Sequence, residues 1–343
     1  MRLHKFAEVD AFVALDLDGA EAASGPVRWA RKILQGGAKD LARSQTYTYA
    51  ALRMRCSGAS AGISAEAPAR AEAVAAFVAE TAALVGDRTF LPDAAKGVSE
   101  RDLAPLRGGD PRNADRLGPF GAQCDGLSAA AAADAAVGLD GRTAIIEGAG
   151  AAVPAVADAV TRRGARVVGL ATAEGSLTAA GGFDPAALAE AWSAHGDKAL
   201  SALAGDGDGL DPAGALWGIP ADVVFAGSRM GVVHHGVAEQ LECRALVPCG
   251  RLAFTSKALA VCRRSGIAAI PDFLALAGST IASWSAPDSS DDEVRAEVPR
   301  TVTALIEEAL TSDDGPFLGA CYAAEAFLST WQDGLPFGRP LAS

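Results

Sequence analysis

This chain is poor in several features that mark other classes of protein. Aromatic residues make up only 6% of its 343 residues, its six cysteines form no Cys-x-x-Cys pair, and it has four histidines. No histidine or cysteine stands at a spacing typical of zinc ligands, so we expect no metal site. No basic stripe with interleaved aromatics occurs, and the formal net charge is −12. An acidic chain of this kind disfavours a nucleic-acid partner.

Long apolar segments are also missing. No apolar span of about 20 residues, the length of a membrane helix, occurs without glycine, proline or a charge, and the N-terminal segment has no long apolar run. We therefore expect neither a signal peptide nor a membrane anchor. The widely spread cysteines are typical of reduced, mostly buried thiols, which predicts a cytoplasmic protein.

The chain is instead rich in alanine, glycine and apolar side chains. Half of its residues are hydrophobic, and 38 are glycine. This composition favours helices that pack closely on sheets. The length suggests two domains of ordinary size.

The pattern of apolar residues predicts the order of the secondary structure. Residues 10–18 alternate like a strand, residues 26–58 contain a long helical pattern, and residues 68–87 have the pattern of an amphipathic helix. Residues 107–123 are polar and irregular, as in a lid or a linker. From about residue 126, short β-branched runs alternate with helices, which predicts a parallel sheet covered on both faces. A Ser/Asp-rich break at 286–292 precedes two final helices.

Residues 143–175 have the layout of a dinucleotide-binding unit. Gly148 and Gly150 follow a predicted strand and precede a helix, where such glycines make a tight turn and let the backbone approach a pyrophosphate. Val153 stands where a third glycine is usual, and Thr172 stands where an acidic residue would hold a ribose. The alternative is that the two glycines only form a tight turn between strand and helix.

Several further segments form a set with this unit. They include GLDGRTAIIEGAGAAV (138–153), ADVVFAGSRMGVV (221–233), SGIAAIPDFLALAGSTIASW (265–284), ASGPVRWA (23–30), TYTYAALRMRCSGASAGIS (46–64) and FLPDAAKG (90–97). Together they resemble the glutamate/leucine/phenylalanine/valine dehydrogenase family, especially its shorter leucine and phenylalanine branch. The resemblance extends from about residue 10 to about residue 330.

The resemblance implies an α/β fold with two domains. Residues 1–123 plus 291–343 would form an α/β substrate and oligomerisation domain, and residues 124–290 a doubly wound, Rossmann-type nucleotide-binding domain. It also implies an active site in the cleft, NAD or NADP as cofactor, a small-molecule substrate and a homo-oligomer. The family's reaction is the reversible oxidative deamination of an L-amino acid. One lysine holds the substrate carboxylate, a second lysine is catalytic, and an aspartate shuttles protons.

The chain departs from the family at these positions. Thr48 stands at the place of the carboxylate lysine and Ser60 at that of the catalytic lysine, whereas Asp93 matches the aspartate. A hydroxyl group cannot replace a full charge, so we do not expect ordinary amino-acid dehydrogenation. Positions on the cofactor side also change, to Cys124, Asp125, Gly231, Arg251 and Leu276.

Other charged residues are candidates to replace the lysines. Lys96 lies three residues after Asp93, and Arg53 lies five after Thr48. An arginine binds an anion with two parallel hydrogen bonds, but solvated surface charge is the alternative for both residues. Arg28 and Arg251 are further candidates of the same kind. The adjacent His234 and His235 are expected at a helix end rather than in a site.

We therefore predict a divergent NAD(P)-dependent oxidoreductase that acts on a C=N or C=O group of a non-standard substrate. Two alternatives stay open: a non-catalytic relative kept as a binding partner, and a redox-neutral enzyme that uses the same cleft. The predicted residues are Asp93, Ser60 and Lys96 for catalysis, Thr48 and Arg53 for the substrate, and Gly148, Gly150, Ala151, Thr172 and Cys124 for the cofactor.

Overall fold

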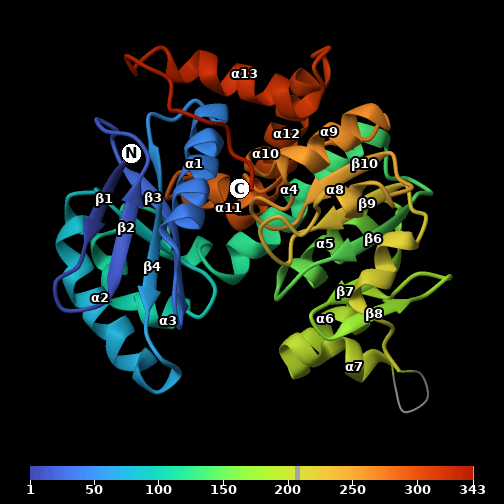
Figure 1. Ribbon diagram of the computed structural model, residues 1–343, viewed down its shortest axis with the longest axis horizontal. Helices are drawn as coiled ribbons and strands as arrows, with labels where there is room; N and C mark the ends of the chain where they lie inside the picture. Colours follow the sequence, from blue (N-terminus) through green and yellow to red (C-terminus); the bar gives the residue numbers. More distant parts are fainter. Residues whose placement is uncertain (205–208, 343) are drawn as a thin grey trace.

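The computed structural model describes residues 1–204 and 209–342. Two lobes, each built on its own sheet, stand side by side, and helix α13 (Pro316–Leu328) lies across the top of both (Figure 1). Core residues are likewise divided into one large cluster around the second sheet and a smaller one around the first.

The first sheet has the strand order β1-β2-β4-β3-β5. Strands β1, β2 and β4 pair antiparallel, and β4, β3 and β5 pair parallel. Helices α1 and α2 cover its opposite faces, and the short α3 follows β5. The bounds are β1 (Arg2–Lys5), β2 (Ala11–Leu15), β3 (Ala23–Ala30), α1 (Gln35–Ala51), β4 (Ser57–Ser64), α2 (Arg70–Gly86), β5 (Leu91–Ala94) and α3 (Glu100–Leu103).

Helix α1 lies unusually close to β4 because the strand carries a glycine at the contact. A Cβ atom on Gly58 would lie 1.8 Å from the Ala42 carbonyl oxygen and 2.5 Å from the Thr46 amide nitrogen. The Gly58 amide donates to Thr46 Oγ1 at 2.9 Å. This close approach fixes α1 over the sheet and so sets the position of the helix residues that follow Thr46.

The second sheet has the order β11-β10-β9-β6-β7-β8 and is parallel except for the β7–β8 pair. The chain leaves the central strand β6 toward β7 on one side and returns to β9 on the other. Ligands bind at such a switch point, beyond the carboxyl ends of the strands. The bounds are β6 (Thr143–Glu147), β7 (Arg166–Thr172), β8 (Gly175–Thr178), β9 (Val223–Ala226), β10 (Ala245–Pro248) and β11 (Ala268–Ala269).

Helices surround the second sheet and connect it to the rest of the molecule. Helix α5 follows β6 and buries Val153, Val156 and Val160 on one face, as the helical spacing predicts. The bounds are α4 (Pro119–Val137), α5 (Ala152–Thr161), α6 (Pro185–His195), α7 (Ala199–Ala204), α8 (His235–Ala238), α9 (Ser256–Arg264), α10 (Asp272–Ala275), α11 (Gly278–Ser283) and α12 (Asp291–Leu310).

The two last helices contact both lobes. Helix α12 packs on α4, whereas α13 packs on α1 and also reaches β11. The division into residues 1–123 plus 291–343 and residues 124–290 therefore stays a prediction, since packing alone assigns the last helices to neither lobe.

The expected fold class, α/β with a doubly wound second lobe, is confirmed. The helix expected at 68–87 and the alternating elements after residue 126 are present. Residues 107–123 form short helical turns and the start of α4. No helix in the described ranges is long and apolar enough to cross a membrane. Those ranges also contain no group of three or more His, Cys, Asp or Glu side chains that could hold a metal ion.

Candidate functional site

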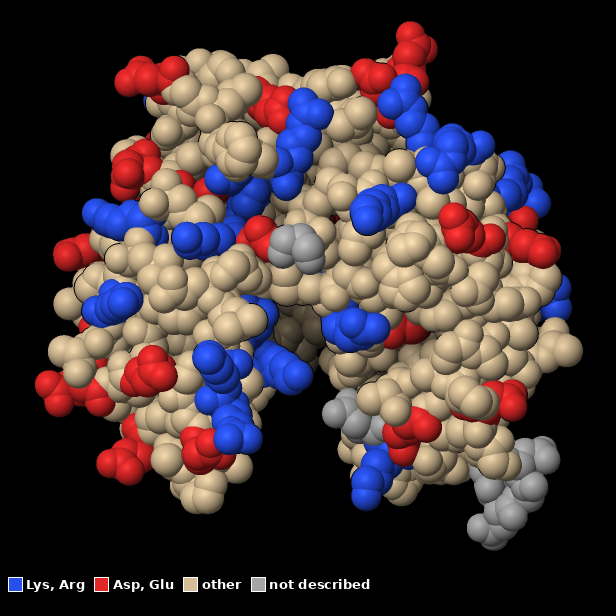
Figure 2. Space-filling view, viewed as in Figure 1, with Lys and Arg blue, Asp and Glu red and all other residues tan. Residues whose placement is uncertain are grey.

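A deep hollow separates the two lobes, and lysine and arginine side chains lie along its walls (Figure 2). On the first lobe we call the face of the sheet that carries α1 the first wall; Ser60 lies on this face because Gly58, two residues earlier in β4, contacts α1. Pro26 on β3 pairs with Asp93 on β5, and Ser60 on β4 donates from Oγ to the Pro26 carbonyl at 3.4 Å. Two strand spacings of about 4.8 Å put Ser60 and Asp93 about 10 Å apart in one row.

Asp93 is held by an arginine that the sequence analysis did not single out. Arg112 Nη1 donates to Asp93 Oδ1 at 2.5 Å, and the same guanidinium makes a two-pronged pair with Asp110. Arg112 is buried, whereas the Asp93 side chain keeps 32% of its surface exposed. Burial would raise the pKa of Asp110, but hydrogen bonds and charge from Arg112 lower it below its ordinary value. This pair orients Asp93, whose side chain stays partly exposed.

A buried hydroxyl pair lies beside Asp93. Tyr49 Oη is 2.5 Å from Ser24 Oγ and accepts from Trp284 Nε1 at 3.1 Å. Burial raises the pKa of Tyr49 to about 12, against the effect of the nearby Arg112. The tyrosine is thus a neutral, fixed group, and it connects α1 to the segment after α11.

Thr48, which the sequence analysis predicts at the place of the carboxylate lysine, contacts an arginine from the opposite lobe. Thr48 on α1 is fully buried, and Arg251 Nη1 donates to its Oγ1 at 3.0 Å. Arg251 Nη2 also donates to the Leu276 carbonyl at 3.3 Å. A cation therefore does lie in the cleft, but it is a guanidinium that belongs to the loop after β10.

Two carboxyl groups face this arginine. Asp125 on α4 accepts from the Ser279 amide at 2.7 Å. Asp272 on α10 accepts from Ser44 Oγ at 2.6 Å and from the Leu252 amide at 3.0 Å. Burial raises the pKa of Asp125 to about 6, although the charge of Arg251 opposes the rise, and burial also raises the pKa of Asp272. Asp125 senses the charge of Asp93 as well, so both lobes contribute to one charged cluster.

The turn at Gly148–Gly150 lies between β6 and α5, on the second lobe's side of the cleft. Gly150 has a φ of +58°, and nothing lies within 4 Å of the place where its Cβ would be. Ala151 is the N-cap of α5, and no side chain caps that helix. The free space and the uncapped amide groups suit the approach of a pyrophosphate. The residues present therefore fit a dinucleotide at this turn.

The ribose side of that site lacks its acid. Thr172 ends β7, and its Oγ1 accepts from the Glu174 amide at 3.2 Å. Glu174 accepts from Ser201 Oγ at 2.8 Å. Next to the turn, Glu147 accepts from the amides of Gly227 and Ser228 at 3.1 Å each. Both glutamates thus accept hydrogen bonds from neighbouring segments. Thr172, the predicted ribose contact, offers a hydroxyl group in place of a carboxylate.

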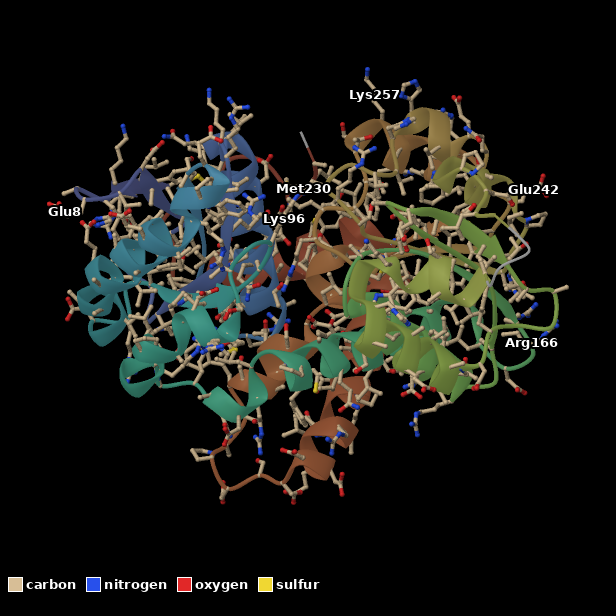
Figure 3. The ribbon with its side chains drawn as sticks, turned by 90° about the horizontal axis from the view of Figure 1, so that it is seen from below. Glu8, Lys96, Arg166, Met230, Glu242 and Lys257 are labelled. Atoms are coloured by element: carbon tan, nitrogen blue, oxygen red, sulfur yellow. The ribbon has the colours of Figure 1, made fainter. Side chains whose placement is uncertain are left out.

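Two cations lie at the junction of the lobes. Figure 3 places Lys96 there together with Met230. Lys96 is exposed, and its carbonyl accepts from the Trp29 amide. Arg28 Nη1 approaches Met230 Sδ at 4.0 Å, and burial lowers the pKa of Arg28. Lys96 thus lies at the rim of the cleft, and among the described residues Asp93 pairs with Arg112 and forms no ion pair with Lys96.

Two predicted residues lie apart from this site. Arg53 packs over the Phe327 ring at 5.7 Å, on the side of α1 that meets α13. Cys124 is fully buried with Val294 and Val298 in an apolar cluster, where burial raises the pKa of the thiol to about 12. The structure therefore brings neither side chain into the cleft. His234 and His235 are exposed at the start of α8, the helix end that was expected.

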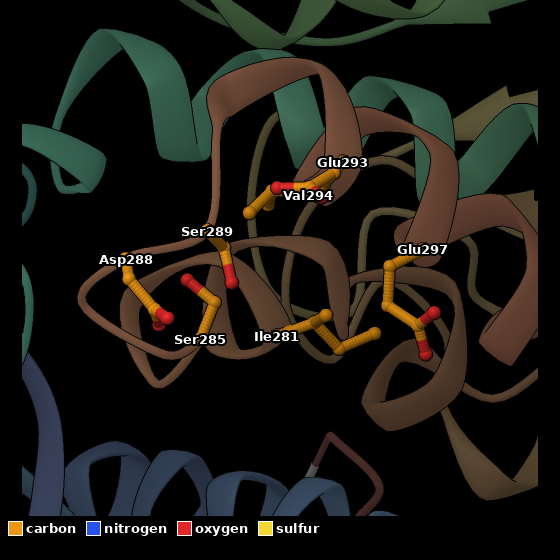
Figure 4. Close-up of a pocket in the computed structure, with 7 residues that line it drawn as sticks. All are labelled: Ile281, Ser285, Asp288, Ser289, Glu293, Val294 and Glu297. Atoms are coloured by element: carbon orange, nitrogen blue, oxygen red, sulfur yellow. The ribbon is translucent and has the colours of Figure 1, made fainter.

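A separate pocket of about 340 Å³ lies beside α11 and α12 (Figure 4). Its lining contains none of the predicted residues. The residues are Ile281, Ser285, Asp288, Ser289, Glu293, Val294 and Glu297. This pocket is therefore separate from the candidate site between the lobes.

Comparison with solved structures shows the same two-lobed fold. The hetero-hexameric glutamate dehydrogenase of Thermus thermophilus, in a leucine-bound form, aligns with a TM-score of 0.76 at 22% identity, over 95% of this chain and 85% of that one. The glutamate dehydrogenase of Plasmodium falciparum aligns with 0.75 at 16%, over 94% and 79%. The L-tryptophan dehydrogenase of Nostoc punctiforme aligns with 0.65 at 15%, over 96% and 94%. At these identities the likeness shows the fold alone.

Sequence comparison assigns the family. No curated protein matches the chain at a significant level. The family model described as Glutamate/Leucine/Phenylalanine/Valine dehydrogenase matches residues 126–311, which is more than half of the chain. The chain therefore belongs to the glutamate/leucine/phenylalanine/valine dehydrogenase family.

Proposed function

We propose that this protein is an NAD(P)-dependent oxidoreductase that acts on a C=N or C=O carbon of a small molecule bound between the lobes. The observation that carries the proposal is the row of Ser60 and Asp93 on one wall, together with the contact of Arg251 from the other lobe with Thr48 on α1. The open glycine turn at Gly150 supports a cofactor site in that second lobe.

The residues of the chain divide the work of such a reaction. Gly148, Gly150 and Ala151 would hold a dinucleotide by its pyrophosphate, and the bound nicotinamide would give or take the hydride. Asp93, oriented by Arg112, would transfer the proton to or from the substrate nitrogen or oxygen. Ser60 is fully buried, and its hydroxyl, which donates to the Pro26 carbonyl, would support this wall next to Asp93. Hydride and proton together balance the reduction of one double bond.

Ordinary oxidative deamination is not what we propose. With Thr48 and Ser60 in place of the two lysines, no ammonium group on the first wall pairs with a carboxylate or stabilises developing oxygen charge. The chain's own groups therefore favour a non-standard amine, imine or carbonyl substrate. The hetero-hexameric Thermus relative supports the further proposal that copies of this chain assemble.

Nicotinamide absorbance tests the proposal. Amines and carbonyl compounds, the latter with and without ammonia, are incubated with protein and each of the four NAD(P)(H) forms. We expect a change in absorbance with at least one substrate, and we expect Asp93→Asn to lower kcat by about 100-fold or more. Asp158→Asn, which alters only an exposed pair with Arg162, is the matched control.

A second candidate, a non-catalytic relative, is favoured by one contact. The Arg251–Thr48 hydrogen bond ties the lobes together at the position that the family leaves to a lysine. If no substrate changes the absorbance and Asp93→Asn has no effect on any ligand-binding signal, this second candidate replaces the first. Substrate turnover without a change in absorbance would instead indicate redox-neutral chemistry.

A further inference from the structure

The Arg251 guanidinium has unused hydrogen-bond donors in the cleft. Within the described residues, the Arg251 guanidinium donates to two neutral acceptors, Thr48 Oγ1 at 3.0 Å and the Leu276 carbonyl at 3.3 Å. No carboxylate oxygen of the described residues lies within 4.0 Å of its nitrogen atoms. A guanidinium has five N–H donors in a planar fork, so this one retains donors for a further acceptor.

The acids near Arg251 are already engaged elsewhere. Asp272 is held by Ser44 and the Leu252 amide, and Asp125 by the Ser279 amide. Both attract the guanidinium over a longer distance without forming an ion pair with it. They hold Arg251 in the cleft and leave its fork unoccupied.

The first lobe's cations near the cleft make other contacts, and Arg28 lies against Met230 at the junction of the lobes. Arg112 is fully committed to Asp93, Asp110 and the Pro92 carbonyl. Lys96 is exposed at the rim. Arg251 is therefore the guanidinium placed to meet an anionic group beside Thr48, and its fork matches the two oxygens of a carboxylate.

We propose that Arg251 is a substrate-binding residue that takes the carboxylate of the ligand from the second lobe, at the position where Thr48 has replaced a lysine of the first. The inference deepens the proposed function and rests on its cleft, but not on hydride transfer. The anchor for the carboxylate and the proton-transfer group Asp93 then belong to different lobes. A bound ligand bridges them, which restricts ligands to those whose carboxylate lies close to the reacting carbon.

Calorimetric titration with oxalate and with pyruvate, in the absence of any nicotinamide, tests the inference. We expect the wild-type protein to bind at least one probe at millimolar concentrations and Arg251→Asn to weaken binding at least tenfold. Arg244→Asn, an exposed arginine just before the opposite end of β10, is the matched control and should bind like the wild type. Adding Thr48→Lys to Arg251→Asn should restore binding, since it returns the cation to α1.

Thermal unfolding checks that each variant is folded. Arg251→Lys is a second test of probe binding, because lysine keeps the positive charge but lacks the paired N–H donors of the guanidinium. It should bind more weakly than the wild type and more tightly than Arg251→Asn. Wild-type protein that binds neither probe, or Arg251→Asn that binds as tightly as wild type, overturns the inference. Because no cofactor is present, these outcomes are independent of whether NAD(P)(H) binds.

Discussion

At the scale of single residues, the site is made of pairs that lie far apart in the sequence. Asp93 is held by Arg112, 19 residues later, and Thr48 is met by Arg251, 203 residues later. The sequence singled out one member of the first pair and gave Arg251 only as a candidate. Arg112 falls in the irregular segment 107–123, where neither helical nor strand periodicity says which way a side chain points.

Arg112 offers a test of the pair that orients Asp93. Arg112→Met removes the guanidinium that pairs with Asp93 and Asp110 and leaves the buried Asp110 carboxylate with Arg107 alone, so we expect the free energy of unfolding to fall by about 3 kcal/mol. Arg162→Met removes an exposed pair with Asp158 and should cost less than about 1 kcal/mol. Urea unfolding of both variants measures the difference. Equal costs would show that Arg112 does not carry a buried charge network.

Asp125 gives the cleft a measurable pH dependence. Its pKa of about 6 in the folded protein exceeds the ordinary 3.8, so the folded state keeps this proton where the unfolded chain has lost it. The contribution of Asp125 to the free energy of unfolding therefore falls as pH rises from about 4 to about 6. The total fall is about 3 kcal/mol, and it is complete above that range.

Asp125→Asn should consequently be more stable than the wild type at pH 8, by up to about 3 kcal/mol, and nearly equal to it below pH 4. Urea unfolding at both pH values tests this, with Asp158→Asn, which alters an exposed pair with Arg162, as the control. A stability difference that is the same at both pH values would contradict the raised pKa.

At the scale of elements, the sequence predicts those helices and strands that have a clear hydrophobic period. Helix α2 and the unit β6–α5–β7 appear where the pattern placed them. Strand β4 carries Ser60, and strand β3 pairs with β5, the strand of Asp93. Both β3 and β4 overlap the ends of the segment 26–58, for which the sequence predicts a helical pattern. Both are rich in Ser, Ala and Gly, residues without strand preference. Tertiary pairing and the close approach of α1, rather than local sequence, make them strands.

Gly58 tests that explanation. A Cβ at this position would overlap the backbone of α1, so Gly58→Ala should lower the free energy of unfolding by about 3 kcal/mol. Gly36, on the exposed N-terminal end of α1, has nothing within 4 Å of its Cβ position. Gly36→Ala should be neutral or slightly stabilising. Thermal unfolding compares the two, and a mild effect at Gly58 would contradict the close packing.

At the scale of the whole molecule, the family resemblance predicts the two-lobed plan, and the structure adds how the lobes are connected. Arg43 of the first lobe pairs with the buried Asp16 and also donates to the carbonyls of Phe337 and Gly338. Ala342, a few residues later, then pairs with Thr255 of the second lobe. Lobe packing of this kind depends on contacts between distant segments, which periodicity does not encode. The position of the positive charge in the cleft cannot be read from periodicity either, because Arg251 reaches Thr48 only through the packing of the two lobes.

The central claim is that the second lobe still binds a nicotinamide dinucleotide at the Gly148–Gly150 turn. Calorimetric titration of NADH and NADPH into wild type, Gly150→Asp and Gly141→Asp measures it directly. Gly141 also has a positive φ and open space at its Cβ position, so both variants introduce the same kind of backbone strain. We expect the wild type and Gly141→Asp to bind at least one cofactor below millimolar concentration, and Gly150→Asp to lose at least tenfold in affinity. No binding by the wild type at millimolar cofactor, or equal binding by both variants, would contradict the account.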